Sequence, residues 1–219
     1  FEEEKLMNIT IKNLTKKIKK ETVLKDINLE FHGGKIYGLQ GKNGCGKTML
    51  MRHLCGFVRP DSGKILIDGK VLNKEIEKPE KLGIIIENPG FLPEYSGYYN
   101  LHLFALIQNK IKKEEIREAM RIVGLDPDSK KHVGKYSLGM RQRLGIAQAI
   151  MEDPDILLLD EPLNGLDNEG VEEIRKVLLS LKEKGKLIIL ASHSKEDIQI
   201  LCDTVFRMDH GKIIATETN

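Results

Sequence analysis

The chain is 219 residues long, and its 35 Lys and Arg residues nearly balance 33 Asp and Glu residues, which gives a formal net charge of +2. Hydrophobic residues make up 40% and charged residues 31%, as in a globular domain with a well-solvated surface. The balanced charge gives no support to broad nucleic-acid binding. No run of 18 apolar residues occurs, so no membrane-spanning helix is expected.

The N-terminal end and the cysteines bear on processing and compartment. The opening FEEEKL, residues 1–6, is interpreted as a tag or an extension, so the domain is expected to span residues 7–219. No secretory signal peptide is recognised. Cys45, Cys55 and Cys202 are odd in number and unpatterned, which favours a reducing compartment over a disulfide framework. We therefore expect a cytoplasmic protein.

Short strands are expected at the start of the chain, before a glycine-rich loop. They span residues 7–14, 24–31 and 35–40. A helix is expected after the loop, at about 46–56. Two further strands follow it, at residues 62–70 and 82–87. The first strands alternate between polar and apolar residues and are separated by turns, so they are predicted to be antiparallel.

Helices dominate the next part of the chain, and buried strands return after it. Two helices are expected within residues 98–124, and another begins near Ser137. The remaining elements are a strand at 155–161, a helix at 168–184, a strand at 186–192, a helix at 195–202 and a hairpin at 204–214. Apolar strands separated by helices indicate a parallel sheet covered on both faces. The expected fold class is therefore α/β, with a mostly parallel sheet core, an N-terminal antiparallel β subdomain and an inserted α-helical subdomain at about 90–150.

The stretch GKNGCGKT, residues 41–48, fits the phosphate-binding pattern G-x-x-x-x-G-K-[ST] between a strand and a helix. Glycines let the backbone curl so that successive N–H groups point at phosphate oxygens, and the helix N-terminus adds its positive end. Lys47 is predicted to reach the β- and γ-phosphates, and Thr48 to offer its hydroxyl to Mg²⁺. The other loop residues expected to bind the nucleotide are Gly41, Asn43, Gly44, Cys45 and Gly46.

Two acids and a histidine follow buried strands. Asp160 ends the run ILLL, and His193 follows LIILAS. Ligands of open parallel sheets bind at the carboxyl ends of the strands, so Asp160 is predicted to hold Mg²⁺ and Glu161 to polarise the attacking water. His193 is predicted to hydrogen-bond the γ-phosphate. Taken alone, Asp160 also fits a strand-end turn and His193 a hydrogen-bonded loop position.

A second anion-binding helix end is predicted within KYSLGMRQR, residues 135–143. Ser137 and Gly139 open an amphipathic helix whose first N–H groups have no intrahelical partner and whose N-terminus carries about half a positive charge. Ser137 adds a hydroxyl, and Gly139 lets the backbone come close to an anion. The pattern does not identify whose phosphate this helix end binds.

Several motifs occur in an order that resembles the ATP-binding subunit of ABC transporters, over nearly the whole chain. GKNGCGKT resembles the Walker A loop, ILLLDE the Walker B strand, YSLGMRQR the signature motif, NGLD the D-loop and SH at 192–193 the switch histidine. The resemblance implies an ATPase that binds ATP and Mg²⁺ and drives a membrane permease from the inner face of the membrane. It also implies two chains packed head to tail, with Ser137, Gly139 and the D-loop residue Asp167 among the nucleotide-binding groups.

The stretch IENPGF, together with SLGMRQR, resembles a subgroup of bacterial exporters of peptide antibiotics such as bacitracin and lantibiotics, which implies export. Two positions depart from the usual family pattern. Glu87 stands where a glutamine is usual, and its carboxylate is expected to hold Mg²⁺ directly or through water. Ile18 stands where an aromatic residue usually stacks on adenine, so adenine is expected to be held by apolar contact and nucleotide selectivity to be loose.

Other interpretations remain open. The main alternative is a soluble ABC-type ATPase with a non-transport role; a P-loop small-molecule kinase would give no reason for SLGMRQR. Residues 91–104 hold five of the eleven aromatic residues, and they form either the core of the helical block or a docking surface for the permease. Cys45, close to Lys47 and a helix N-terminus, either reacts as a thiolate or fills a tight loop.

Overall fold

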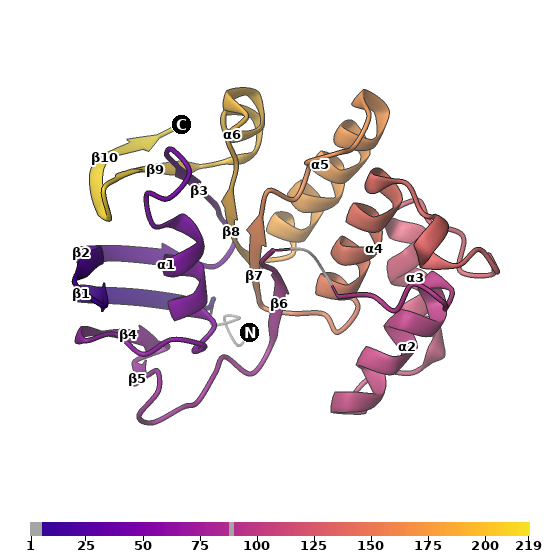
Figure 1. The fold of residues 1–219 in the computed structure, drawn as a ribbon, viewed down its shortest axis with the longest axis horizontal. Coiled ribbons are helices and arrows are strands. Elements are labelled where there is room, and N and C mark those ends of the chain that lie inside the picture. Colours follow the sequence, from indigo (N-terminus) through magenta and orange to yellow (C-terminus); the bar gives the residue numbers. More distant parts are fainter. Residues whose placement is uncertain (1–5, 88–89) are drawn as a thin grey trace, which may run out of the picture.

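The computed structural model describes residues 6–87 and 90–219, and within these residues the strands form two sheets. Residues 1–5 of the expected tag and residues 88–89 of the stretch IENPGF lie outside this part of the chain. The two sheets lie next to each other with helix α1 (Lys47–Leu54) between them, and further helices extend to one side (Figure 1).

The smaller sheet is antiparallel and has the strand order β2-β1-β4-β5. Its strands are β1 (Asn8–Ile18), β2 (Glu21–His32), β4 (Ser62–Ile67) and β5 (Lys70–Val71). The antiparallel N-terminal sheet is therefore confirmed, but the predicted bounds of its first two strands were too short. The apolar alternation stops at Leu14, whereas backbone pairing continues through the lysine-rich stretch to the pair Ile18–Glu21.

The larger sheet has the order β10-β9-β3-β8-β7-β6. It contains β3 (Ile36–Gln40), β6 (Leu82–Ile85), β7 (Ile156–Asp160), β8 (Leu187–Ala191), β9 (Thr204–Asp209) and β10 (Lys212–Thr218). All neighbouring pairs are parallel except the β9–β10 hairpin. Since β3, β8 and β7 lie side by side, the residues that follow these three strands meet at one edge of the sheet.

Helices cover the larger sheet, as its apolar strands predicted. Besides α1, they are α2 (Gly97–Gln108), α3 (Lys113–Ile122), α4 (Leu138–Ile150), α5 (Asn168–Glu183) and α6 (Lys195–Leu201), with a 3₁₀ turn at Val133–Lys135. Helices α2, α3 and α4 gather on the side away from the smaller sheet (Figure 1). The two helices predicted within 98–124 and the helix start at Ser137 are confirmed.

Alternate residues of the central strands face two separate cores. Leu158 and Ile189 pack with α1 and the smaller sheet, whereas Leu157 and Leu159 pack with the helices on the opposite face. All four side chains are fully or almost fully buried, which explains why these strands have a continuous apolar sequence. No helix of the described residues has the length and apolar character needed to cross a membrane.

Candidate functional site

The loop between β3 and α1 has the backbone shape of a phosphate cradle. Gly44 and Gly46 adopt φ angles of +80° and +111°, in the left-handed region that favours glycine. The loop leads directly into α1, whose first turn carries no acidic residue. The N–H groups and the positive end of this helix are therefore available to an anion.

Lys47 spans the loop from the first position of α1. Its ammonium donates hydrogen bonds to the carbonyl oxygens of Gly41, at 2.6 Å, and Lys42, at 3.2 Å. The side chain is only 8% exposed. The positive charge is thus fixed inside the loop, where phosphate oxygens would otherwise meet mainly neutral N–H donors.

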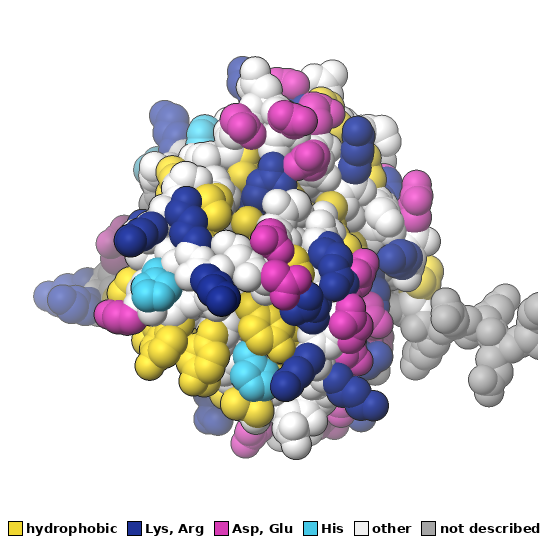
Figure 2. Space-filling view, turned by 90° about the vertical axis from the view of Figure 1, so that its right-hand side faces the viewer, with side chains coloured by type: hydrophobic (Ala, Val, Ile, Leu, Met, Phe, Trp, Pro, Cys, Tyr) yellow, Lys and Arg dark blue, Asp and Glu magenta, His cyan; other side chains and the backbone are white. Residues whose placement is uncertain are grey.

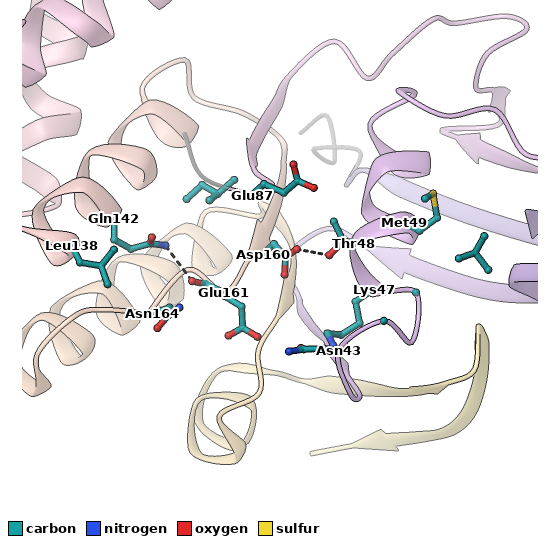
Figure 3. Close-up of a pocket in the computed structure, with 14 residues that line it drawn as sticks. Asn43, Lys47, Thr48, Met49, Glu87, Leu138, Gln142, Asp160, Glu161 and Asn164 are labelled. Atoms are coloured by element: carbon teal, nitrogen blue, oxygen red, sulfur yellow. Dashed lines mark hydrogen bonds between the residues drawn. The ribbon is translucent and has the colours of Figure 1, made fainter. Parts of the chain in front are cut away.

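Thr48 and Asp160 meet although 112 positions separate them in the chain. The Thr48 hydroxyl donates to Oδ2 of Asp160 at 2.7 Å (Figure 3). A hydroxyl and a carboxylate beside a phosphate cradle are hard oxygen donors of the kind that Mg²⁺ prefers. The donor set therefore fits Mg²⁺, and Thr48 and Asp160 are the residues that would hold it.

Glu161 and His193, which the sequence analysis placed separately at this edge, form a second pair. Oε2 of Glu161 lies 2.8 Å from Nδ1 of His193. Glu161 has φ of +50°, and its N–H donates to the carbonyl of Ala191 at 2.9 Å, which ties the end of β7 to the end of β8. The His193 side chain is 73% exposed, so its ring is accessible from solvent.

Lys47, Thr48, Asp160 and Glu161 line one cavity of about 480 Å³, which extends from the cradle toward α4. His193 contacts Glu161 but does not belong to this lining. Asn43, on the cradle, and Leu138, Gln142 and Asn164, on the opposite side, also line it (Figure 3). Val23 of β2 lines it as well, whereas Ile18, at the end of β1, does not belong to the lining and is 44% exposed. The predicted apolar contact of Ile18 with adenine stays a prediction.

Gln142 is a residue of this site that sequence reasoning missed. Its side-chain amide donates to the carbonyl oxygens of Glu161, at 3.2 Å, and Pro162, at 2.8 Å. The signature helix α4 is therefore hydrogen-bonded to the turn that carries Glu161. The sequence signals Gln142 only as the polar residue within RQR. Polar residues on any exposed helix face give the same pattern, so this signal does not identify a site residue.

Ser137, Gly139 and Asp167 lie apart from the cradle, and none of them lines its cavity. Ser137 is exposed and caps α4, since its Oγ accepts a hydrogen bond from the Met140 N–H at 3.1 Å. Asp167, also exposed, caps α5 by accepting from the Gly170 N–H at 2.9 Å. The first turn of α4 contains no acidic residue, so its end is electrostatically open to an anion.

Glu87 lies at the rim of the same cavity, but its carboxylate forms an ion pair with Arg52 of α1. The backbone of Glu87 has φ of +65°. The pair is exposed to solvent, with 37% of the Arg52 side chain and 62% of the Glu87 side chain accessible. The expected role of Glu87 as a metal ligand stays a prediction.

Cys45 is 5% exposed, and its Sγ lies 4.0 Å from Nζ of Lys47. Burial raises the pKa of the Cys55 thiol and of the Cys202 thiol to about 12, so both stay protonated at neutral pH. Cys45 is the thiol that lies within the cradle.

We expect N-ethylmaleimide to modify Cys45 before the other two cysteines, and we expect ATP to slow this modification. Peptide mass mapping measures both effects. Alkylation of Cys45 is also expected to block nucleotide binding. If protein alkylated at Cys45 binds ATP normally, the thiol only fills space.

Comparisons with known proteins agree with this geometry. The family model for the ABC transporter matches residues 24–164. The uncharacterized ABC transporter ATP-binding protein YybJ of Bacillus subtilis (strain 168) is 48% identical over 95% of this chain and 96% of its own length. The bacitracin transport ATP-binding protein BcrA of Enterococcus faecalis is 41% identical over 94% of this chain and 68% of BcrA. The lantibiotic transport ATP-binding protein SrtF of Streptococcus pyogenes is 36% identical over 94% of this chain and 89% of SrtF.

The fold also matches a solved structure, the dimeric structure of MJ0796, a bacterial ABC transporter cassette. The TM-score is 0.86 at 22% identity, over 96% of this chain and 98% of that chain. Together, the cradle after β3 and the acids at the end of β7 define a P-loop nucleoside triphosphatase. The sequence comparisons narrow this class of protein: the chain belongs to the ABC transporter family, as an ATP-binding subunit with ATPase activity. The resemblance to the bacitracin and lantibiotic transport subgroup is confirmed as sequence similarity.

Proposed function

We propose that this chain supplies the energy for a membrane permease by binding and hydrolysing ATP between two paired ATP-binding subunits. One observation carries the proposal. The Thr48–Asp160 and Glu161–His193 pairs meet at one edge of the sheet, and the N-terminal end of α4, which Ser137 caps and which has no acidic residue in its first turn, is exposed on the other side of the cavity. We propose that residues 7–219 act as a single ATPase domain and that about 90–150 form its helical subdomain.

In the proposed reaction, the cradle N–H groups and Lys47 bind the phosphates of ATP. Glu161 accepts the proton of the water that attacks the γ-phosphate, and His193 hydrogen-bonds that phosphate. Thr48 and Asp160 would hold Mg²⁺, with Glu87 assisting through water; the ion, when bound, would neutralise charge on the phosphates. Glu161 suits the role of base because its carboxylate is anchored by His193 and its backbone by Ala191.

Pairing of two chains would complete each ATP site. The exposed end of α4 has two features suited to a phosphate of the partner's nucleotide. The Oγ of Ser137 accepts the capping hydrogen bond, so its hydroxyl proton is free to donate. The N–H of Gly139 belongs to the first turn, where N–H groups lack an intrahelical partner. A Cβ at this position would lie 3.0 Å from the carbonyl oxygen of Gly165, so glycine here makes room for the loop before α5. Asp167, the N-cap of α5, directly follows Leu166, which lies next to Gly139. The dimeric structure known for MJ0796 supports this arrangement by analogy.

The permease would dock on the side formed by α2, α3 and α4. Figure 2 faces this side and shows hydrophobic side chains gathered in its lower part, near Lys, Arg and His residues. Exposed apolar residues of this region include Tyr95, Tyr99, Leu106 and Ile107. Since relatives are transport proteins for bacitracin and lantibiotics, we propose export of a peptide antibiotic or similar amphiphile. The chain would then lie on the cytoplasmic face of the membrane.

Tyr98→Ala tests the permease part of this proposal. Tyr98 lies in the first turn of α2, half-buried, and its ring stacks on His102 with centroids 6.1 Å apart. We expect the variant to lower permease-stimulated ATPase activity several-fold while the ATPase activity of the isolated chain persists, because the cradle is unchanged. Activity is measured with and without a membrane permease that co-purifies with this chain. Ile214→Ala removes an exposed apolar side chain on β10 and serves as the control. Equal loss of both activities in Tyr98→Ala would contradict a docking role.

A further inference from the structure

Arg52 and Thr48 belong to the same side of α1. They are four residues apart, so their side chains project next to one another along the helix. Thr48 donates to Asp160, whereas Arg52 is paired with Glu87, two residues beyond the end of β6. One helix therefore carries both the hydroxyl of the expected metal site and the cation that neutralises Glu87.

Glu87 has two possible cationic partners. The carboxylate lies at the rim of the cavity that Thr48 and Asp160 also line, and in Figure 3 it points away from their hydrogen bond. A divalent cation held by Thr48 and Asp160 would attract this carboxylate more strongly than the single charge of a guanidinium. The Arg52–Glu87 pair is solvent-exposed, and exposed ion pairs are weak, so it is readily exchanged.

We propose that Arg52 competes with the divalent cation for Glu87 and thereby sets the cation affinity of the site. This inference rests on the proposed function, because it assumes that the nucleotide binds together with Mg²⁺. Arg52 is a positioning residue here: it touches neither nucleotide nor metal, and it acts through the carboxylate that it holds. A glutamine in place of Glu87 would carry no charge for which the two cations could compete.

The test is a Mg²⁺ titration of the binding of a fluorescent ATP analogue, on the full chain at constant ionic strength. Arg52→Gln is expected to lower the Mg²⁺ concentration for half-maximal binding about two- to fivefold, in line with the strength of an exposed ion pair. In a Glu87→Gln background the same substitution is expected to have no further effect. Replacing Mg²⁺ by Mn²⁺ allows free metal to be counted by electron paramagnetic resonance, which does not depend on turnover.

Arg207→Gln is the matched control. Arg207 pairs with Glu217 on the β9–β10 hairpin, and that pair has similar exposure, 49% and 47%. The Arg207→Gln substitution removes the same charge as Arg52→Gln and should leave the Mg²⁺ dependence unchanged. If Arg52→Gln shifted the Mg²⁺ dependence equally in the wild-type and Glu87→Gln backgrounds, or if Arg207→Gln shifted it too, the cause would be a general charge effect and the proposal would be overturned. The absence of any shift in Arg52→Gln would also overturn it. If the wild-type chain bound no nucleotide, the proposed function itself would fail, and this inference with it.

Discussion

Glu161→Gln is expected to slow ATP hydrolysis about 10²- to 10⁴-fold while ATP binding is retained, because general-base catalysis contributes on that scale. Glutamine has nearly the same size as glutamate but does not accept the proton of the attacking water. The backbone hydrogen bond from residue 161 to Ala191 does not involve the side chain and should persist. The cradle, with Lys47 and Thr48, is unchanged, so the nucleotide should still bind.

The expected consequence is a stalled, ATP-bound pair of chains. Steady-state phosphate release measures the rate, and size-exclusion chromatography with light scattering measures the mass with and without ATP. Glu169→Gln is the matched control, since Glu169 lies in the first turn of α5 and loses the same charge outside the cavity. Hydrolysis at the wild-type rate in Glu161→Gln would exclude Glu161 as the base, and a lack of ATP-dependent dimers in a variant that binds ATP would contradict the proposed pairing.

The grouping of the site residues was predictable because it depends on strand order. Each of Thr48, Asp160 and His193 follows or ends an apolar strand, and such strands form the centre of a parallel sheet. Once β3, β8 and β7 are neighbours, their carboxyl ends must meet. This topology predicts that Thr48, Asp160, Glu161 and His193 lie near one edge of the sheet, whereas the Thr48–Asp160 hydrogen bond and the Glu161–His193 contact also depend on side-chain rotamers.

Contacts made by long polar side chains were not predictable in the same way. Gln142 reaches the carbonyl of Glu161, and Arg52 reaches Glu87, but neither contact leaves a trace in periodicity or spacing. Both depend on rotamers and on how α4 and α1 sit against the sheet. The pairing of β1 with β2 beyond Leu14 escaped prediction for a related reason, since exposed lysines carry no apolar alternation to mark a strand.

Lys47→Ala is expected to abolish turnover and to weaken ATP binding about tenfold to a hundredfold, since a hydrogen bond to a charged partner contributes about 1.5–3 kcal/mol. Lys47 is the buried cation of the cradle, at 8% exposure, and its ammonium also bridges the carbonyls of Gly41 and Lys42. The substitution therefore removes both a phosphate partner and a cross-link of the loop. Binding is measured by titration with a fluorescent ATP analogue, and turnover by phosphate release.

Lys42→Ala separates these local effects from a loss of charge alone. Lys42 belongs to the same loop, but its side chain is exposed, and the carbonyl that accepts from Lys47 is part of the backbone and remains. This control should bind and hydrolyse ATP close to the wild-type level. Thermal denaturation of both variants tests whether the loop change spreads to the core. If Lys47→Ala hydrolysed ATP as well as Lys42→Ala, residues 41–48 would not be the phosphate cradle, and the assignment of the whole cavity would fall with it.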